Sequence, residues 1–203
     1  MSEVVRGARA RRRQALVDEI VEAADALVHA EGLAGLSMRD LGTRVGLHSS
    51  SLYQYFPSKL DIYDALFARW HRQLDAWMSS FDRDGDPEQV FRIGSARFTA
   101  FCMADPVRYQ LLFQRTIPGF APSEASMALA WQTYHEMIAA LADVGVTEPA
   151  DVDLWTAIQM GITEQQWAND PGGRRFADHL EPAIDMFLAH VRPRRPSSRR
   201  KKL

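Results

Sequence analysis

The chain has 203 residues, of which 46% are hydrophobic and 25% are charged, and its formal net charge at pH 7 is −2. This length and apolar content suffice for one large core or two modest ones and exclude a chain that is disordered throughout. The single cysteine, Cys102, excludes an internal disulfide and a metal site built from several cysteines, and it favours a reducing compartment. No apolar run approaches membrane-spanning length, and no apolar segment follows the N-terminal arginines as in a secretory signal. We therefore expect a cytoplasmic protein with no membrane partner.

The charge is distributed unevenly along the chain. Residues 1–60 carry a net +1, residues 61–190 a net −10 and residues 191–203 a net +7. Nucleic-acid binding depends on local rather than net charge, so the acidic middle would repel DNA while a basic N-terminal arm would attract it. The arm consists of Arg6, Arg9, Arg11, Arg12 and Arg13. A solvated tail is the alternative interpretation of this run, and equally of the C-terminal run RPRRPSSRRKK.

The first helix is predicted over about Arg12–Ala30. Its apolar residues recur at helical spacing on one stripe, and Gly32 ends it. We expect this stripe to pack against the segment that follows, which is too short to bury a core of its own.

The stretch after this helix predicts a helix-turn-helix. Ser37 and Asp40 form a capping box that opens a short helix, and Gly46 supplies the positive φ that ends it. A second short helix is predicted over about Ser49–Phe56. Hydroxyls and amides on its N-terminal half suit the major groove, where base edges offer donors and acceptors. A helical hairpin from some other all-α domain, with serines that are merely solvated, is the alternative.

The run SMRDLGTRVGLHSSSLYQYFPSK resembles the DNA-binding signature of TetR-type transcriptional regulators, a helix-turn-helix that ends in L-Y-x-x-F-x-x-K. One departure is His48, at a position where many relatives carry a small capping serine, which leaves the start of the recognition helix open. The resemblance implies base-reading positions at Arg39, Ser49, Ser50, Tyr53 and Gln54. It implies phosphate-binding positions at Ser51, Tyr53, Tyr55 and Lys59.

The rest of the chain reads as further helices. Ser58 with Asp61 caps a fourth helix whose apolar seam continues to Trp77, and Asp86-Pro87 restarts the chain after the boundary DRDGDPE. Further helices are predicted over about 105–113, 123–145, 149–168 and 176–191. Because Pro182 falls inside the last pattern, we expect a kink there or a new start near Leu180.

No strand-like alternation appears, so the predicted class is all-α. The resemblance implies an N-terminal three-helix helix-turn-helix head joined by a long fourth helix to a helical ligand-binding and dimerisation body. The predicted domains are a DNA-binding domain over 10–57 and a ligand-binding and dimerisation domain over 58–191. Basic flexible tails are predicted over 1–9 and 192–203. The surplus apolar residues of the last two helices predict a dimer seam formed by Leu154, Ile158, Ile162, Ile184, Phe187 and Leu188.

Motifs for catalysis or metal binding are absent from the sequence. The six histidines are isolated, and none has the spacing of a helical metal site such as H-E-x-x-H. We predict no catalytic residue, no metal and no cofactor. Core packing accounts for most of the aromatics of the body, but polar residues interleaved among them also suit a small-molecule site, which the family resemblance implies. The candidate ligand-binding residues are Phe98, Phe101, Tyr109, Phe113, Trp131, Tyr134, Trp155 and Gln159.

The runs DPVRYQLLFQRTIPGF and ANDPGG also resemble the ligand-binding domains of one TetR subgroup. Together the resemblances imply a homodimeric repressor that is released from a double-stranded, pseudo-palindromic DNA operator by an unknown small apolar or aromatic effector. A two-fold dimer presents two recognition helices where a monomer presents one. The alternatives are a DNA-binding protein without an effector and an all-helical enzyme with a vestigial head.

Overall fold

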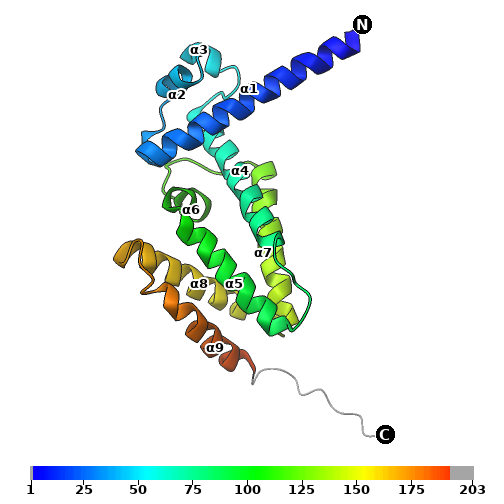
Figure 1. Ribbon diagram of the computed structural model, residues 1–203, viewed down its shortest axis with the longest axis vertical. Coiled ribbons are helices and arrows are strands. Elements are labelled where there is room, and N and C mark those ends of the chain that lie inside the picture. Colours follow the sequence, from blue (N-terminus) through cyan, green and yellow to red (C-terminus); the bar gives the residue numbers. More distant parts are fainter. Residues whose placement is uncertain (1, 193–203) are drawn as a thin grey trace. The chain divides into compact units, whose positions relative to one another are not determined.

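The computed structural model describes residues 2–192, with side chains from Gly7 onward. These residues form nine α-helices and two short 3₁₀ helices and contain no strand, which confirms the all-α prediction (Figure 1). No helix in this range is long and apolar enough to span a membrane. The predicted tail over 192–203 lies outside the described residues, apart from Arg192.

The chain folds as two compact units. Unit 1 comprises Met1–Gln73 and Val107–Ala130, and unit 2 comprises Leu74–Pro106 and Trp131–Leu203. The predicted boundary at 57/58 does not coincide with this division.

Unit 1 begins with the helices of the predicted head and later includes most of α6. Its elements are α1 (Ser2–Glu31), η1 (Leu33–Gly35), α2 (Met38–Arg44), α3 (Ser49–Leu52) and α6 (Pro106–Phe113). Unit 2 contains α5 (Pro87–Ala104), α8 (Pro149–Asn169), η2 (Ala177–His179) and α9 (Leu180–Val191). Three helices contribute residues to both units: α4 (Lys59–Ser79), α7 (Glu124–Asp143) and α6, of which only Pro106 belongs to unit 2.

Helix α1 begins at Ser2 rather than at Arg12. Alanine and arginine are among the strongest helix formers, and the run Ala8–Arg13 contains no other residue type. Gly7 costs about 1 kcal/mol relative to alanine in a helix, and the favourable residues after it offset that cost. The segment 1–9 is therefore helical from Ser2 onward, where a flexible tail was predicted.

Three predicted helix starts are confirmed. The hydroxyl of Ser37 accepts the N–H of Asp40 (3.3 Å) at the start of α2, and the Asp86 carboxylate accepts the N–H of Gln89 (3.3 Å) at the start of α5. At the start of α4 the capping is reciprocal: the Asp61 carboxylate accepts the N–H of Ser58 (2.7 Å), and the Ser58 hydroxyl accepts the N–H of Asp61 (3.3 Å).

The new start predicted near Leu180 is also confirmed. The chain forms η2 and then begins α9 at Leu180, which places Pro182 in the first turn of α9. A helix makes no use of its first N–H groups, so the missing N–H of proline costs little there.

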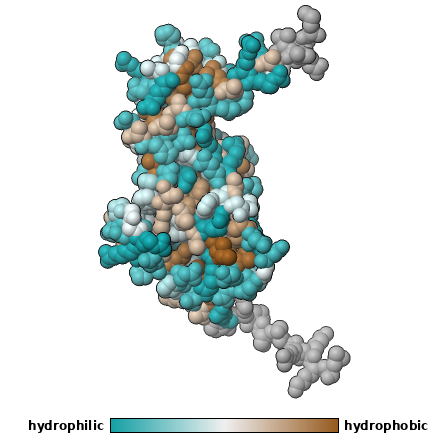
Figure 2. All heavy atoms as spheres, in the orientation of Figure 1, coloured by the Kyte–Doolittle hydropathy of each residue, from teal (hydrophilic) through white to brown (hydrophobic). Residues whose placement is uncertain are grey.

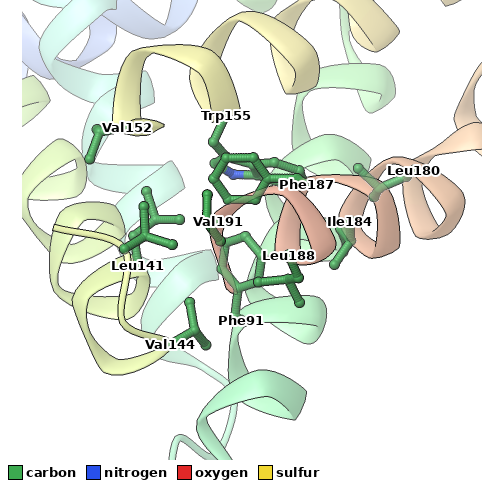
Figure 3. Close-up of a cluster of buried hydrophobic side chains, with 11 residues drawn as sticks. Phe91, Leu141, Val144, Val152, Trp155, Leu180, Ile184, Phe187, Leu188 and Val191 are labelled. Carbon is green, nitrogen blue, oxygen red and sulfur yellow. The ribbon is translucent and has the colours of Figure 1, made fainter. Parts of the chain in front are cut away.

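The core of unit 2 surrounds Trp155 of α8 (Figure 3). The indole ring, 0% exposed, lies 5.0 Å from the ring of Phe91 and 5.2 Å from that of Phe187. Ile184 and Leu188 of α9 belong to the same cluster and are at most 2% exposed. Ile184, Phe187 and Leu188 therefore pack inside the protomer and are not available to the dimer seam predicted for them.

The core of unit 1 joins the head to the first part of α4. Ile20 of α1, Leu41 of α2, Leu52 of α3 and Ile62 of α4 are all 0% exposed. Burying each such side chain contributes about 1.5–3 kcal/mol, so the two short helices are stable through this packing rather than through their own length.

Candidate nucleic-acid interface

Two glycines set the turn between α2 and α3. Gly46 has φ 68°, a left-handed conformation that favours glycine. A Cβ atom at Gly42 would lie 2.8 Å from the carbonyl oxygen of Leu47, whose N–H donates to the carbonyl of Gly42 (2.8 Å). The backbone of the turn thus passes over α2 at a distance that leaves no room for a side chain, and this approach fixes where α3 begins.

The predicted recognition helix, α3, is shorter than the sequence indicated. It covers Ser49–Leu52, and the N–H groups of Gln54 and Tyr55 donate to carbonyls only three residues back. This tighter turn ends at Pro57, because a residue before proline disfavours the α-helical conformation. His48 is the N-cap and makes no side-chain capping bond, so α3 begins at Ser49 as predicted, but without a cap.

The predicted base-reading side chains lie mostly on the exposed part of the head. Arg39, Ser50, Tyr53 and Gln54 are exposed, Tyr53 by 48%, and Ser49 is half-buried. Leu52 and Phe56, by contrast, are buried. The burial of these two residues turns the polar part of α3 outward, as contact with base edges requires.

Two of the predicted phosphate-binding residues have partners inside unit 1. The guanidinium of Arg13 lies 4.8 Å from the ring centre of Tyr55, and it donates to the carbonyl oxygen of Gln54 (3.3 Å). Lys59 donates through Nζ to the carbonyl oxygen of Ala34 (3.3 Å). Sequence reasoning placed Arg13 only in the basic arm and missed that it holds the end of the α3 turn.

Lys59 and Tyr63 together attach α4 to the segment that precedes α2. The Lys59 ammonium lies 5.5 Å from the ring centre of Tyr63, whose hydroxyl donates to the carbonyl of Leu33 (2.5 Å). Tyr63 is 2% exposed, and this burial raises the pKa of its hydroxyl to about 12. The phenol therefore remains a hydrogen-bond donor at every physiological pH.

The predicted ligand-binding residues have diverse surroundings. In unit 1, Tyr109 is buried and its ring lies 5.6 Å from that of half-buried Phe113. In unit 2, Trp131 is 51% exposed and lies 5.6 Å from the half-buried ring of Tyr134. Trp155, which is enclosed in the core, has a packing role in this structure.

Gln159 of α8 already uses its amide group for structure. Its Nε2 donates to the carbonyl oxygen of Ser95 (2.9 Å) and to the hydroxyl of Thr99 (3.2 Å), both on α5. Phe98 and Phe101 of α5 are half-buried and buried, respectively. A ligand role for these residues stays a prediction.

Sequence reasoning treated His71 as one of six isolated histidines, yet the structure buries it in unit 1 at 3% exposure. A signal was present, because His71 stands four residues after Phe67 and so lies on the apolar stripe of α4. A polar residue on a buried stripe is a reason to look for its hydrogen-bond partner. Within residues 2–192 no group of three or more His, Cys, Asp or Glu residues is placed to hold a metal ion.

Comparison with known sequences identifies the head. Residues 20–66 match the family model described as bacterial regulatory proteins, tetR family. The HTH-type transcriptional repressor DrrR1 of Streptomyces coeruleorubidus is 43% identical over 56 residues, which cover 28% of this chain. The same match covers 21% of DrrR1, so this chain aligns with about a fifth of that protein's length.

Solved structures match over most of the chain. The TetR family transcriptional regulator PfmR from Thermus thermophilus is similar with a TM-score of 0.61 and 19% identity, covering 84% of this chain and 97% of PfmR. AibR, solved in complex with isovaleryl coenzyme A and operator DNA, is similar with a TM-score of 0.57 and 14% identity, covering 84% of this chain and 97% of AibR. At such identities the likeness establishes a common fold.

Proposed function

This chain belongs to the tetR family of bacterial regulatory proteins, and from that premise we propose that it is a transcriptional repressor that leaves a pseudo-palindromic DNA operator when a small apolar or aromatic effector binds. A matched relative is named as a repressor, and AibR was solved with both an acyl coenzyme A and operator DNA. We also propose a cytoplasmic location, where the DNA is, and no catalytic activity.

The observation that carries the DNA-binding part is the composition of the exposed side of α3. Ser50, Tyr53 and Gln54 offer hydroxyl and amide groups, which donate to and accept from base edges. Arg39 adds a side chain that can pair with guanine in two hydrogen bonds. Arg13 supplies positive charge at Gln54, and Lys59 supplies it at Ala34 before α2, and positive charges of this kind can contact phosphates.

A second copy of the chain is the proposed partner on DNA. Figure 2 shows apolar side chains interrupting the hydrophilic surface of unit 2 on the face drawn. The large apolar residues exposed in unit 2 include Leu154 of α8, at 39%, and Met186 of α9, at 63%. These two residues replace the buried Ile184, Phe187 and Leu188 as the centre of the proposed dimer seam.

The proposed coupling between effector and DNA runs along α4. This helix starts at Lys59, beside the head, and its residues from Leu74 onward belong to unit 2. An effector that moves α4 would move the attachments of Lys59 and Tyr63 to the segment before α2. By thermodynamic reciprocity, DNA must weaken effector binding by the same factor, and a coupling of about 1–3 kcal/mol would change each affinity five- to 150-fold.

Two substitutions in the head test the proposal on DNA that the protein selects from a random pool. Lys59→Ala should weaken binding to all sequences alike and reduce the slope of log affinity against log salt by about one, because one phosphate contact is lost. Ser50→Ala should instead change which sequence is preferred, because the hydroxyl faces base edges.

Arg174→Ala is the matched control, since it removes an exposed positive charge from unit 2. It should leave both the salt slope and the preferred sequence unchanged. If Lys59→Ala behaves like this control, the phosphate assignment is wrong. If no sequence is enriched from the pool, the repressor proposal fails, and an enzyme with a vestigial head becomes the better reading.

A further inference from the structure

His71 of α4 is a buried polar side chain without a hydrogen bond. Its imidazole is 3% exposed, and neither Nδ1 nor Nε2 has a partner among the residues that the structure describes. Buried polar groups in folded proteins are nearly always hydrogen-bonded, so an unpaired one calls for an explanation in a bound molecule or in strain.

Two aromatic rings of unit 1 lie beside the imidazole. The ring of Phe67, one turn earlier on α4, lies 4.4 Å from the imidazole, and the ring of Phe113 of α6 lies 6.2 Å from it. Phe120 lies 6.4 Å from Phe67 and extends this aromatic group. Phenylalanine offers no hydrogen bond to either ring nitrogen, so these neighbours cannot satisfy the imidazole.

The charge state of His71 restricts what can bind beside it. Burial lowers the pKa of His71 to about 4, so the ring is neutral at pH 7. A neutral imidazole has one N–H donor and one bare nitrogen acceptor. A carboxylate would have to give up its hydration to reach this buried position, whereas a hydrocarbon would leave both nitrogens unpaired. A hydroxyl group can donate to one nitrogen or accept from the other.

We infer that the imidazole of His71 is the polar contact for the effector, and that the effector is a neutral aromatic molecule carrying a hydroxyl group. The aromatic part packs against Phe67 and Phe113, and the hydroxyl bonds one nitrogen of His71. This inference rests on the proposed function, because it names the ligand class of the effector site. It also explains why this position of α4 holds histidine, although an apolar residue would pack there without an unpaired group.

The test compares phenol with toluene, two probes of similar shape that differ in the hydroxyl. Their dissociation constants are measured on the full chain by NMR titration, for the wild type and for His71→Phe, whose ring fills similar space without a hydrogen bond. We expect the preference for phenol over toluene to be about tenfold greater in the wild type than in His71→Phe, equivalent to about 1.4 kcal/mol. The ratio between variants cancels the different hydration of the two probes.

The nitrogen resonances of the imidazole give a second readout. Phenol should shift the ¹⁵N signals of His71, which are the signals missing from His71→Phe, and toluene should leave them nearly unchanged. His71→Asn, which keeps a donor and an acceptor in a smaller side chain, should retain part of the preference for phenol.

Two outcomes would overturn the inference. One is a preference for phenol over toluene that is equal in the wild type and in His71→Phe. The other is that the nitrogen signals of His71 do not respond to phenol. Either result would assign an ordered water, rather than the effector, as the partner of the unpaired nitrogens. Measuring DNA binding by His71→Phe distinguishes a failure of this inference from a failure of the proposed function. The variant should bind selected DNA as the wild type does, so loss of the phenol preference with DNA binding intact concerns only the ligand site.

Discussion

At the scale of single residues, Lys59, the proposed phosphate contact, is already held in place by neighbours in the head. A free lysine loses up to about 2 kcal/mol of rotamer entropy when it is fixed. Its bond to the carbonyl of Ala34 and its position over Tyr63 already restrict its rotamers. Under the proposed function, a phosphate would bind a side chain that is partly ordered in advance, and less entropy would be lost on binding.

His71 gives a residue-scale prediction on pH dependence. The pKa of about 4 in the folded chain lies below the ordinary value of 6.5, so the unfolded chain takes up the proton first as the pH falls. Stability is therefore unaffected above about pH 6.5 and is lost progressively as the pH falls towards 4. At pH 5 the loss is about 2 kcal/mol.

His71→Phe has no such proton to take up, so its free energy of unfolding minus that of the wild type should increase by about 2 kcal/mol between pH 7.5 and pH 5. Urea unfolding of both proteins at the two pH values measures the difference. Parallel pH dependences would show that the imidazole is not buried in the neutral form.

At the scale of helices, start signals are readable from sequence because they are local. Ser37, Ser58 and Asp86 each cap the helix that was predicted from them, since a capping bond joins residues only three apart. The start of α1 was missed because the arginine-rich run suits a solvated arm and a helix equally well. The end of α3 was missed because its last turn tightens before Pro57.

For the candidate site, as for the helices, the local features were predictable from the sequence and the features that depend on packing were not. The exposed side of α3 follows from the local pattern, in which Leu52 and Phe56 are the apolar positions. The burial of Trp155 and the bonds of Gln159 to α5 depend on which helices pack together, and one sequence does not specify that packing. His71 was missed although its place on the apolar stripe of α4, four residues after Phe67, was readable from the sequence.

The link between α4 and the head is an element-scale feature with a test. A chain of ring contacts joins Phe67 to Phe120 (6.4 Å) and Phe120 to Tyr63 (6.0 Å), and the Tyr63 hydroxyl donates to Leu33 just before α2. A shift of α4 at His71, one turn beyond Phe67, would be transmitted through this packing.

Tyr63→Phe should leave the Leu33 carbonyl without its partner and reduce stability by about 1–3 kcal/mol. The loosened attachment should also weaken DNA binding, while the phenol preference at His71 remains. Urea unfolding and fluorescence anisotropy on selected DNA measure the two effects. Tyr134→Phe in unit 2 is the control and should retain wild-type affinity for DNA; equal affinities of Tyr63→Phe and wild type would remove the link from the mechanism.

At the scale of the whole molecule, the proposed dimer depends on a small exposed apolar surface. Met186→Glu places a charge on the outer side of α9, where the side chain is 63% exposed and its loss leaves the core intact. We expect this variant to sediment as a folded monomer at concentrations where the wild type is a dimer. Ile93→Glu, on α5 of the same unit, should remain dimeric. A dimeric Met186→Glu would place the seam elsewhere.

The central claim is that two copies of α3 read one duplex. Two recognition helices fit successive major grooves when their half-sites are about 34 Å, or one helical turn, apart. The most direct measurement is the affinity for the selected palindrome before and after insertion of about five base pairs between its halves, which turns one half-site to the opposite side of the duplex. We predict that the insertion lowers the affinity to that of a single half-site. Unchanged affinity after the half-turn insertion would contradict the account, because it would mean that each α3 binds DNA independently of the other.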